Sequence, residues 1–331
     1  MKFSIQNLRQ TIEPLGQFLL LPFLSLLFFQ SHLLIFLAPL PLMYGFKKHG
    51  RRGGYLLSFL ALGLALVSGS PTTFLIFLLT APLIALLFCE LSELKLPLDQ
   101  LILRTTVLLI LFYGVVLGFV SKGHVYTFFH GHAVQYLHSL PQILDQNVAS
   151  FSSFKKLNPS QFDQLKEKLV TVAQTADAIS ATWIQEKLFG YVVSGILLTL
   201  WLATLLLRFF RIPIGRASSG REDLTKWKAP DHLIWFFIAS FFFNEITVPI
   251  VTPVARNIFT ILLAIYFLHG VAIAAFYFSH KNYTSFQKAL GYVLLVLFPF
   301  LPASFGLFDL WINFRSHIGK QNKKPVLKPK L

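Results

Sequence analysis

Charged residues are scarce in this chain. Of its 331 residues only 13% are Asp, Glu, Lys or Arg, whereas 55% are hydrophobic, and a soluble domain carries about 25% charged residues. So few polar groups cannot cover a surface that faces water, and the composition therefore excludes a soluble enzyme. The alternative solvent is lipid, in which only helices and closed barrels satisfy their own backbone hydrogen bonds.

The short alternating segments of a membrane barrel are also missing. A barrel strand alternates apolar and polar residues over roughly ten positions, whereas the apolar residues here form continuous runs such as 105–120 and 191–207. The sequence therefore predicts an all-α integral membrane protein, a bundle of about eight transmembrane helices.

Cysteine is limited to one residue, Cys89, inside an apolar run. A single cysteine excludes an intrachain disulfide and a cysteine-based metal site. The sequence also has no Walker motif, no G-x-G-x-x-G, no H-E-x-x-H and no G-x-S-x-G. We therefore expect no cofactor and no enzymatic activity.

Acidic residues are outnumbered: 29 Lys and Arg stand against 14 Asp and Glu, a formal charge of +15. In a membrane protein such an excess marks cytoplasmic loops and meets anionic lipid headgroups, so we expect no nucleic-acid partner. Residues 47–54 hold four positive charges and no acid, and a second basic loop follows residue 208.

The apolar runs divide the chain into four parts. We predict about five membrane spans in residues 1–121, a non-cytoplasmic helical insertion in 122–186, further membrane helices in 187–312, and a basic, disordered cytoplasmic tail in 313–331. Within the insertion, Pro159 and Ser160 precede apolar residues at helical spacing, which predicts a helix start and an amphipathic hairpin.

The last apolar segment, 289–312, has two prolines in its middle, Pro299 and Pro302. A single crossing would place the basic tail outside the cell, against the positive-inside bias. We therefore favour a broken, re-entrant pair over one complete crossing.

Polar residues inside or beside the spans are the candidate ligand-binding residues, because such residues are costly in lipid. For Glu245 and Arg256 the alternative is snorkelling at a boundary. For Asp309 it is structural pairing, with Arg315 or with a basic residue of the second cytoplasmic loop. The candidates are Asn244, Glu245, Asn257, His269 and Asp309.

Four histidines lie close together in residues 124–138. Of these, His130 and His132 could chelate a metal. No carboxylate falls in the same stretch, and histidine is common at membrane interfaces, so we expect no metal site here.

Several short segments resemble the YybS-like family of predicted bacterial membrane proteins. They are residues 39–54, the stretch 209–213 with Arg211, the stretch 227–235 with Trp227 and Pro230, residues 257–270, and the closing run 306–315 ending in Arg315. The resemblance gives Arg211, Trp227, Pro230 and Arg315 structural or topological roles, and it implies a multi-pass protein of the bacterial inner or plasma membrane.

That family is also similar in its expected fold to the substrate-binding subunits of energy-coupling-factor vitamin transporters. The resemblance implies binding or transport of a small molecule in a pocket at the outer face. The alternative is a non-enzymatic envelope assembly or scaffold protein that binds a protein partner through the 122–186 hairpin or the basic tail. An intramembrane enzyme would need His269, Asp309 and Glu245 together in one cavity.

Overall fold

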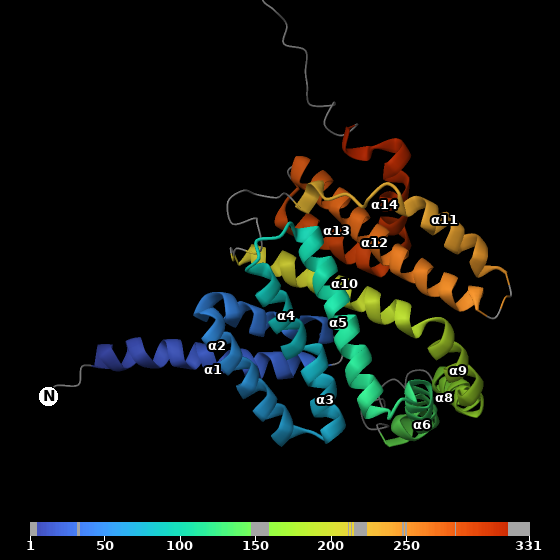
Figure 1. The fold of residues 1–331 in the computed structure, drawn as a ribbon, viewed down its shortest axis with the longest axis horizontal. Helices are drawn as coiled ribbons and strands as arrows, with labels where there is room; N and C mark the ends of the chain where they lie inside the picture. The colour runs from blue at the N-terminus through green and yellow to red at the C-terminus, as the bar shows by residue number, and fades with distance from the viewer. Residues whose placement is uncertain are drawn as a thin grey trace, which may run out of the picture. The chain divides into compact units, whose positions relative to one another are not determined.

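The computed structural model describes residues 5–31, 34–146, 159–210, 212, 214, 224–246, 248, 250–281 and 283–316. Within these residues every regular element is a helix (Figure 1). The expected helical fold is therefore confirmed.

The first half of the chain contains α1 (Ile5–Gln30), the short 3-10 helix η1 (Ile35–Leu37), α2 (Pro39–Ser68), α3 (Pro71–Thr80), α4 (Pro82–Ser92), α5 (Leu98–Val120) and α6 (Val125–Gln146). The second half contains α8 (Pro159–Gln174), α9 (Ala176–Glu186), α10 (Leu188–Phe209), η3 (Leu224–Lys226), α11 (Leu233–Asn244), α12 (Val251–His280), α13 (Ser285–Leu297) and α14 (Phe300–Ile312).

The helices belong to two compact units. The first comprises residues 1–113, 193–234 and 262–331, and the second comprises residues 114–192 and 235–261. In the first unit α2 packs against α1, α3 and α4. Its core contains Leu42, Met43, Leu57, Phe77 and Phe88, all fully buried.

Helix α2 is bent at Gly50, whose φ of 73° lies in the left-handed region that favours glycine. The basic stretch 47–54 therefore lies at a bend within one helical element. The basic residues at the bend have acidic partners on α4 and just after it. Lys47 Nζ lies 2.6 Å from Glu93 Oε1, and Arg51 pairs with Glu90.

Four helical segments of the described chain are long and apolar enough to cross a membrane: Pro71–Ser92, which combines α3 and α4, Leu98–Val120, Leu188–Arg208 and Val251–His280. A fifth is added if the bent pair α13 and α14 counts as one span. Two shorter apolar helices are Phe18–Gln30 and Leu233–Asn244. The expected number of eight spans is therefore not confirmed.

The terminal apolar segment is broken where its prolines predicted. Helices α13 and α14 meet at 93°, with Pro299 at the N-cap position of α14. Proline has no N–H to donate and disfavours a helical conformation for the residue before it, so the helix ends before Phe298 and starts again at Phe300.

In the second unit α6, α8 and α9 pack on one another (Figure 1). Helix α8 begins at Pro159, as its start signal predicted. On the contacting face Phe162, Ala173 and Ala176 are buried. The described part of the 122–186 insertion is thus helical and packs on itself.

Candidate functional site

A buried polar cluster in the first unit joins α12 to α14 and to the segment before α11. We call it the His269 cluster, and it consists of Trp227, His269, Asp309 and Arg315. His269 Nε2 lies 3.2 Å from Asp309 Oδ2, and the two side chains are only 2% and 3% exposed. Two ionisable groups are therefore held away from water in an otherwise apolar region.

Close backbone contact between α12 and α14 brings the pair together. A Cβ added to Gly270 would lie 1.7 Å from the carbonyl oxygen of Pro302, and one added to Gly306 would lie 2.1 Å from that of Tyr266. Small residues at a helix crossing let two backbones approach in this way. His269 precedes one of these glycines and Asp309 follows the other by almost one turn.

The end of α14 fixes the Asp309 carboxylate. Asn313 takes a left-handed conformation with φ of 50° and donates its N–H to the Asp309 carbonyl at 2.9 Å. The chain therefore turns back, and the N–H of Phe314 donates to Asp309 Oδ1 at 2.8 Å. One carboxylate oxygen is thus held by the backbone, and the other faces His269 and Arg315.

Arg315 links the carboxylate to the segment before α11. Its Nη1 lies 3.7 Å from Asp309 Oδ2, and its Nη2 donates to the carbonyl oxygen of Trp227 at 2.8 Å. The Trp227 ring stands edge-on to the His269 ring, with 6.0 Å between centroids. Three segments far apart in the sequence therefore meet at Asp309.

A small cavity lies beside the cluster. It has room of about 10 Å³ for the centre of a water molecule, close to what one water requires. Its lining residues are Lys228, Ala229, Pro230, Asp231, Tyr266, His269, Gly306 and Leu310. His269 Nδ1 has no hydrogen-bond partner among the described residues, so this side of the cluster has unused hydrogen-bonding capacity.

A second polar cluster lies in the second unit, and we call it the Arg256 cluster. Arg256 of α12 pairs with Glu186 at the end of α9, and its Nε donates to Asn244 Oδ1 at 3.1 Å. Asn244 in turn donates through Nδ2 to Glu245 Oε1 at 3.1 Å. The arginine therefore connects the ends of α9 and α11 to the first turns of α12.

Asn257 completes this cluster with three hydrogen bonds. Its Nδ2 donates to the carbonyl oxygens of Glu186 at 2.9 Å and of Pro253 at 2.7 Å. Its Oδ1 accepts from the N–H of Gly190. Both amide donors are in use: one satisfies a carbonyl at the junction between α9 and α10, and the other satisfies a carbonyl one turn earlier in α12.

The structure divides the predicted candidates between the two clusters. His269 and Asp309 meet in the first, as do Trp227 and Arg315, and Pro230 lines the cavity there. Arg315 lies within ion-pair distance of Asp309, which is the structural pairing that the sequence offered as the alternative for this residue. Asn244, Glu245 and Asn257 belong to the second unit, and Arg211 lies outside the described residues.

Two contributions were missed from the sequence. No local pattern marks Glu186 as the partner of Arg256, which lies 70 positions further on and pairs with it. The glycines Gly270 and Gly306 were not recognised as a helix crossing. Their signal was available, because small residues on apolar helices are typical of close packing in membranes.

The two weak metal candidates have separate partners. His130 Nε2 lies 3.6 Å from Asp177 Oδ1, whereas His132 Nδ1 lies 2.8 Å from the carbonyl oxygen of Phe128. Within the part of the chain that the structure describes, no group of three His, Cys, Asp or Glu side chains could hold a metal ion.

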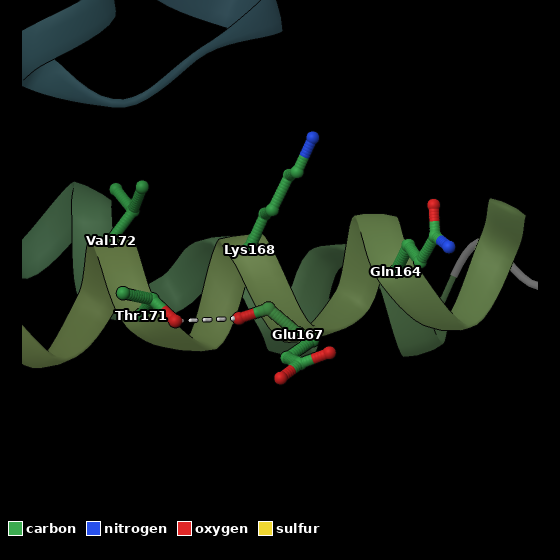
Figure 2. A pocket seen from close by; sticks show the side chains of 5 residues that line it. All are labelled: Gln164, Glu167, Lys168, Thr171 and Val172. Atoms are coloured by element: carbon green, nitrogen blue, oxygen red, sulfur yellow. Dashed lines mark hydrogen bonds between the residues drawn. The ribbon is translucent and has the colours of Figure 1, made fainter.

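A larger hollow lies along α8, but all its lining residues come from that one helix (Figure 2). Gln164, Glu167, Lys168, Thr171 and Val172 form it. Figure 2 shows a Thr171 hydroxyl that donates to the Glu167 carbonyl of its own helix. Among the described residues its lining comes from a single helix, so it carries no argument for a binding site.

The apolar helices and the buried polar cluster define a helical membrane protein. The model of the family described as "Predicted membrane protein (DUF2232)" matches residues 17–310. The chain therefore belongs to this family. Neither the curated proteins nor the solved structures include a match.

Proposed function

We propose that this protein binds a small polar solute within the membrane and carries it across, with the His269 cluster at the centre of the pathway. It would act without catalysis, as a multi-pass protein of a bacterial plasma membrane. The resemblance to the YybS-like family, and through it to transporter substrate-binding subunits, supports this proposal. The basic loops would contact anionic headgroups of the same membrane.

The observation that carries the proposal is the burial of His269 and Asp309 together. Ionisable residues within membrane helices are costly, and they are found along ion and substrate pathways. A pair of apolar side chains would join α12 to α14 at a lower cost in desolvation.

The broken helix beside the cluster supports the same role. Discontinuous helices line the binding sites of many secondary transporters, and Asp309 lies on α14, the second half of the broken pair. The cavity holds about one water molecule in this arrangement. Solute entry would therefore require the elements that line the cavity to move apart.

Native mass spectrometry of protein purified gently from its own membranes tests the proposal. We expect a reproducible small-molecule adduct that is lost in Asp309→Asn and in His269→Gln. Asp177→Asn is the matched control, because Asp177 is an exposed carboxylate of α9. Parallel measurements on Asn257→Ala and Glu245→Ala show whether the second cluster also contributes to binding.

The competing function is a scaffold, and one observation favours it. Helices α6, α8 and α9 expose large apolar side chains, among them Tyr136, Leu165 and Trp183, which could contact a protein partner. A mass without any adduct, but with a second protein chain retained, would favour the scaffold. An adduct that persists unchanged in Asp309→Asn would exclude the His269 cluster as its binding site.

A further inference from the structure

We propose that the His269 cluster is a proton-binding site in which protonated His269 and Arg315 compete for Asp309. This inference rests on the proposed function and deepens it, because it names the proton as the ion that drives solute movement. The evidence for this inference is the geometry around one carboxylate oxygen of Asp309.

That oxygen, Asp309 Oδ2, has two basic neighbours. His269 Nε2 is 3.2 Å away and Arg315 Nη1 is 3.7 Å away. While His269 is neutral, Arg315 and Asp309 balance each other. When the imidazole gains a proton, two cations share one anion in a region of low dielectric, where repulsion between them is strong. Protonation therefore weakens the hold of Arg315 on the carboxylate.

The proton has a route to the imidazole. His269 lines the water-sized cavity, and the exposed side chains of Lys228 and Asp231 line it as well. A water molecule in this cavity would pass a proton from solvent to the ring, which becomes an imidazolium, and would accept it again on release. No other bond is formed or broken in this exchange.

Every charged or titratable group that faces His269 enters this balance. Asp309 and Arg315 come from α14 and the turn after it, and Lys228 and Asp231 come from the segment between η3 and α11. The last two pair with each other at 2.7 Å, so their charges largely cancel. Tyr266, one turn earlier on α12, also lines the cavity. Asp309 and Arg315 therefore dominate the response of His269 to pH.

Release of Arg315 would have a structural effect. Its Nη2 holds the carbonyl oxygen of Trp227, so a weaker contact with Asp309 would also free the segment that covers the cavity. Proton binding would thereby open the cluster toward the segment that contains Trp227, and proton loss would close it.

Trp227 fluorescence provides a test that needs no solute. An imidazolium quenches a neighbouring indole more strongly than a neutral imidazole does, and the two rings are 6.0 Å apart. The protein is reconstituted in nanodiscs, and the emission of Trp227→Phe is subtracted from that of the wild type from about pH 3 to about pH 9, a window wide enough for the shifts of several units that buried groups show. We expect the difference signal to fall as the pH is lowered.

Two charge variants should shift the midpoint of the pH response in opposite directions. Asp309→Asn removes the anion that favours the imidazolium, so the midpoint should move down by about 1–3 pH units. Arg315→Gln removes a competing cation, so the midpoint should move up. His269→Gln should abolish the pH response, and Lys166→Gln, which alters an ion pair between α8 and α6 in the second unit, should leave it unchanged.

Three results would overturn the proposal: no pH response in the wild-type difference signal, a response that survives His269→Gln, or shifts of the same sign in Asp309→Asn and Arg315→Gln. Circular dichroism and gel filtration check that each variant is folded, and His269→Asn replaces His269→Gln if the latter does not fold. Because no solute is present, failure here leaves the adduct experiment as an independent test of transport.

Discussion

Helix α12 carries polar side chains in two places, and their contacts differ in exposure and in completeness. Arg256 and Glu186 are 31% and 21% exposed, and the Asn257 amide uses both of its donors. His269 and Asp309 are almost fully buried, and neither ring nitrogen of His269 has a hydrogen-bond partner among the described residues, although Nε2 lies within ion-pair distance of Asp309. Satisfied hydrogen bonds at helix ends favour a structural role for the Arg256 cluster. Unsatisfied polar atoms in a buried site favour a functional role for the His269 cluster.

The largest loss of stability should come from a substitution at the close contact between α12 and α14, which positions the buried cluster. In Gly270→Ala the new methyl group would overlap the Pro302 carbonyl, which would force α12 and α14 apart. We expect a loss of about 3 kcal/mol, measured as a fall in the thermal unfolding temperature in detergent. Gly114→Ala is the matched control, because nothing lies within 4 Å of its added Cβ. Equal effects of the two substitutions would show that the crossing is loosely packed.

A smaller loss is expected at the Arg256 cluster. Arg256→Ala leaves Glu186 without its cation and Asn244 without its donor, at a cost of about 2 kcal/mol. Arg256→Lys keeps the charge but loses the planar fork, and should fall between the wild type and Arg256→Ala. If Arg256→Ala unfolds at the wild-type temperature, the cluster does not stabilise the fold and its structural interpretation is wrong.

Substitution of Asn257 isolates the hydrogen bonds at the junction of α9 and α10. Asn257→Asp keeps the oxygen that accepts from Gly190 but loses the donors to the Glu186 and Pro253 carbonyls. We expect a loss of about 1 kcal/mol, and a greater one in Asn257→Ala. The comparison between the two clusters would fail if these variants lost solute binding while keeping full thermal stability.

The smallest loss of stability is expected at an exposed ion pair, which provides a baseline for the other substitutions. Lys166 and Asp145 form an ion pair at 2.7 Å between α8 and α6, but both side chains are about half exposed. Such pairs contribute about 0.5 kcal/mol or less, so Lys166→Ala should leave the unfolding temperature nearly unchanged. A larger fall would indicate that α6 and α8 depend on this contact more than their exposed positions suggest.

The sequence predicted the elements that depend on local pattern. Continuous apolar runs located α5, α10 and α12, and two prolines located the break between α13 and α14. The start of α8 followed from the residues around Pro159. These features depend on composition and spacing within one segment, which a single sequence displays directly.

The contacts within the clusters depend on residues that are far apart in the chain. Arg315 reaches the carbonyl of Trp227 across 88 positions, and Arg256 reaches Glu186 across 70. A single sequence contains no record of which distant side chains meet. The pairing of Asp309 with Arg315 was predictable because six residues separate them and a chain reversal joins them. The pairing of His269 with Asp309 was not, because it depends on how α12 crosses α14.

The short apolar helices have a consequence for the rest of the chain. Helices α11 and α14 contain 12 and 13 residues, which corresponds to about 18–20 Å, whereas the hydrocarbon core of a bilayer is about 30 Å thick. Neither helix is therefore long enough to cross that core on its own. The backbone groups at a helix end that stops inside the hydrocarbon must be satisfied by protein rather than by lipid, so other parts of the chain must cover these ends.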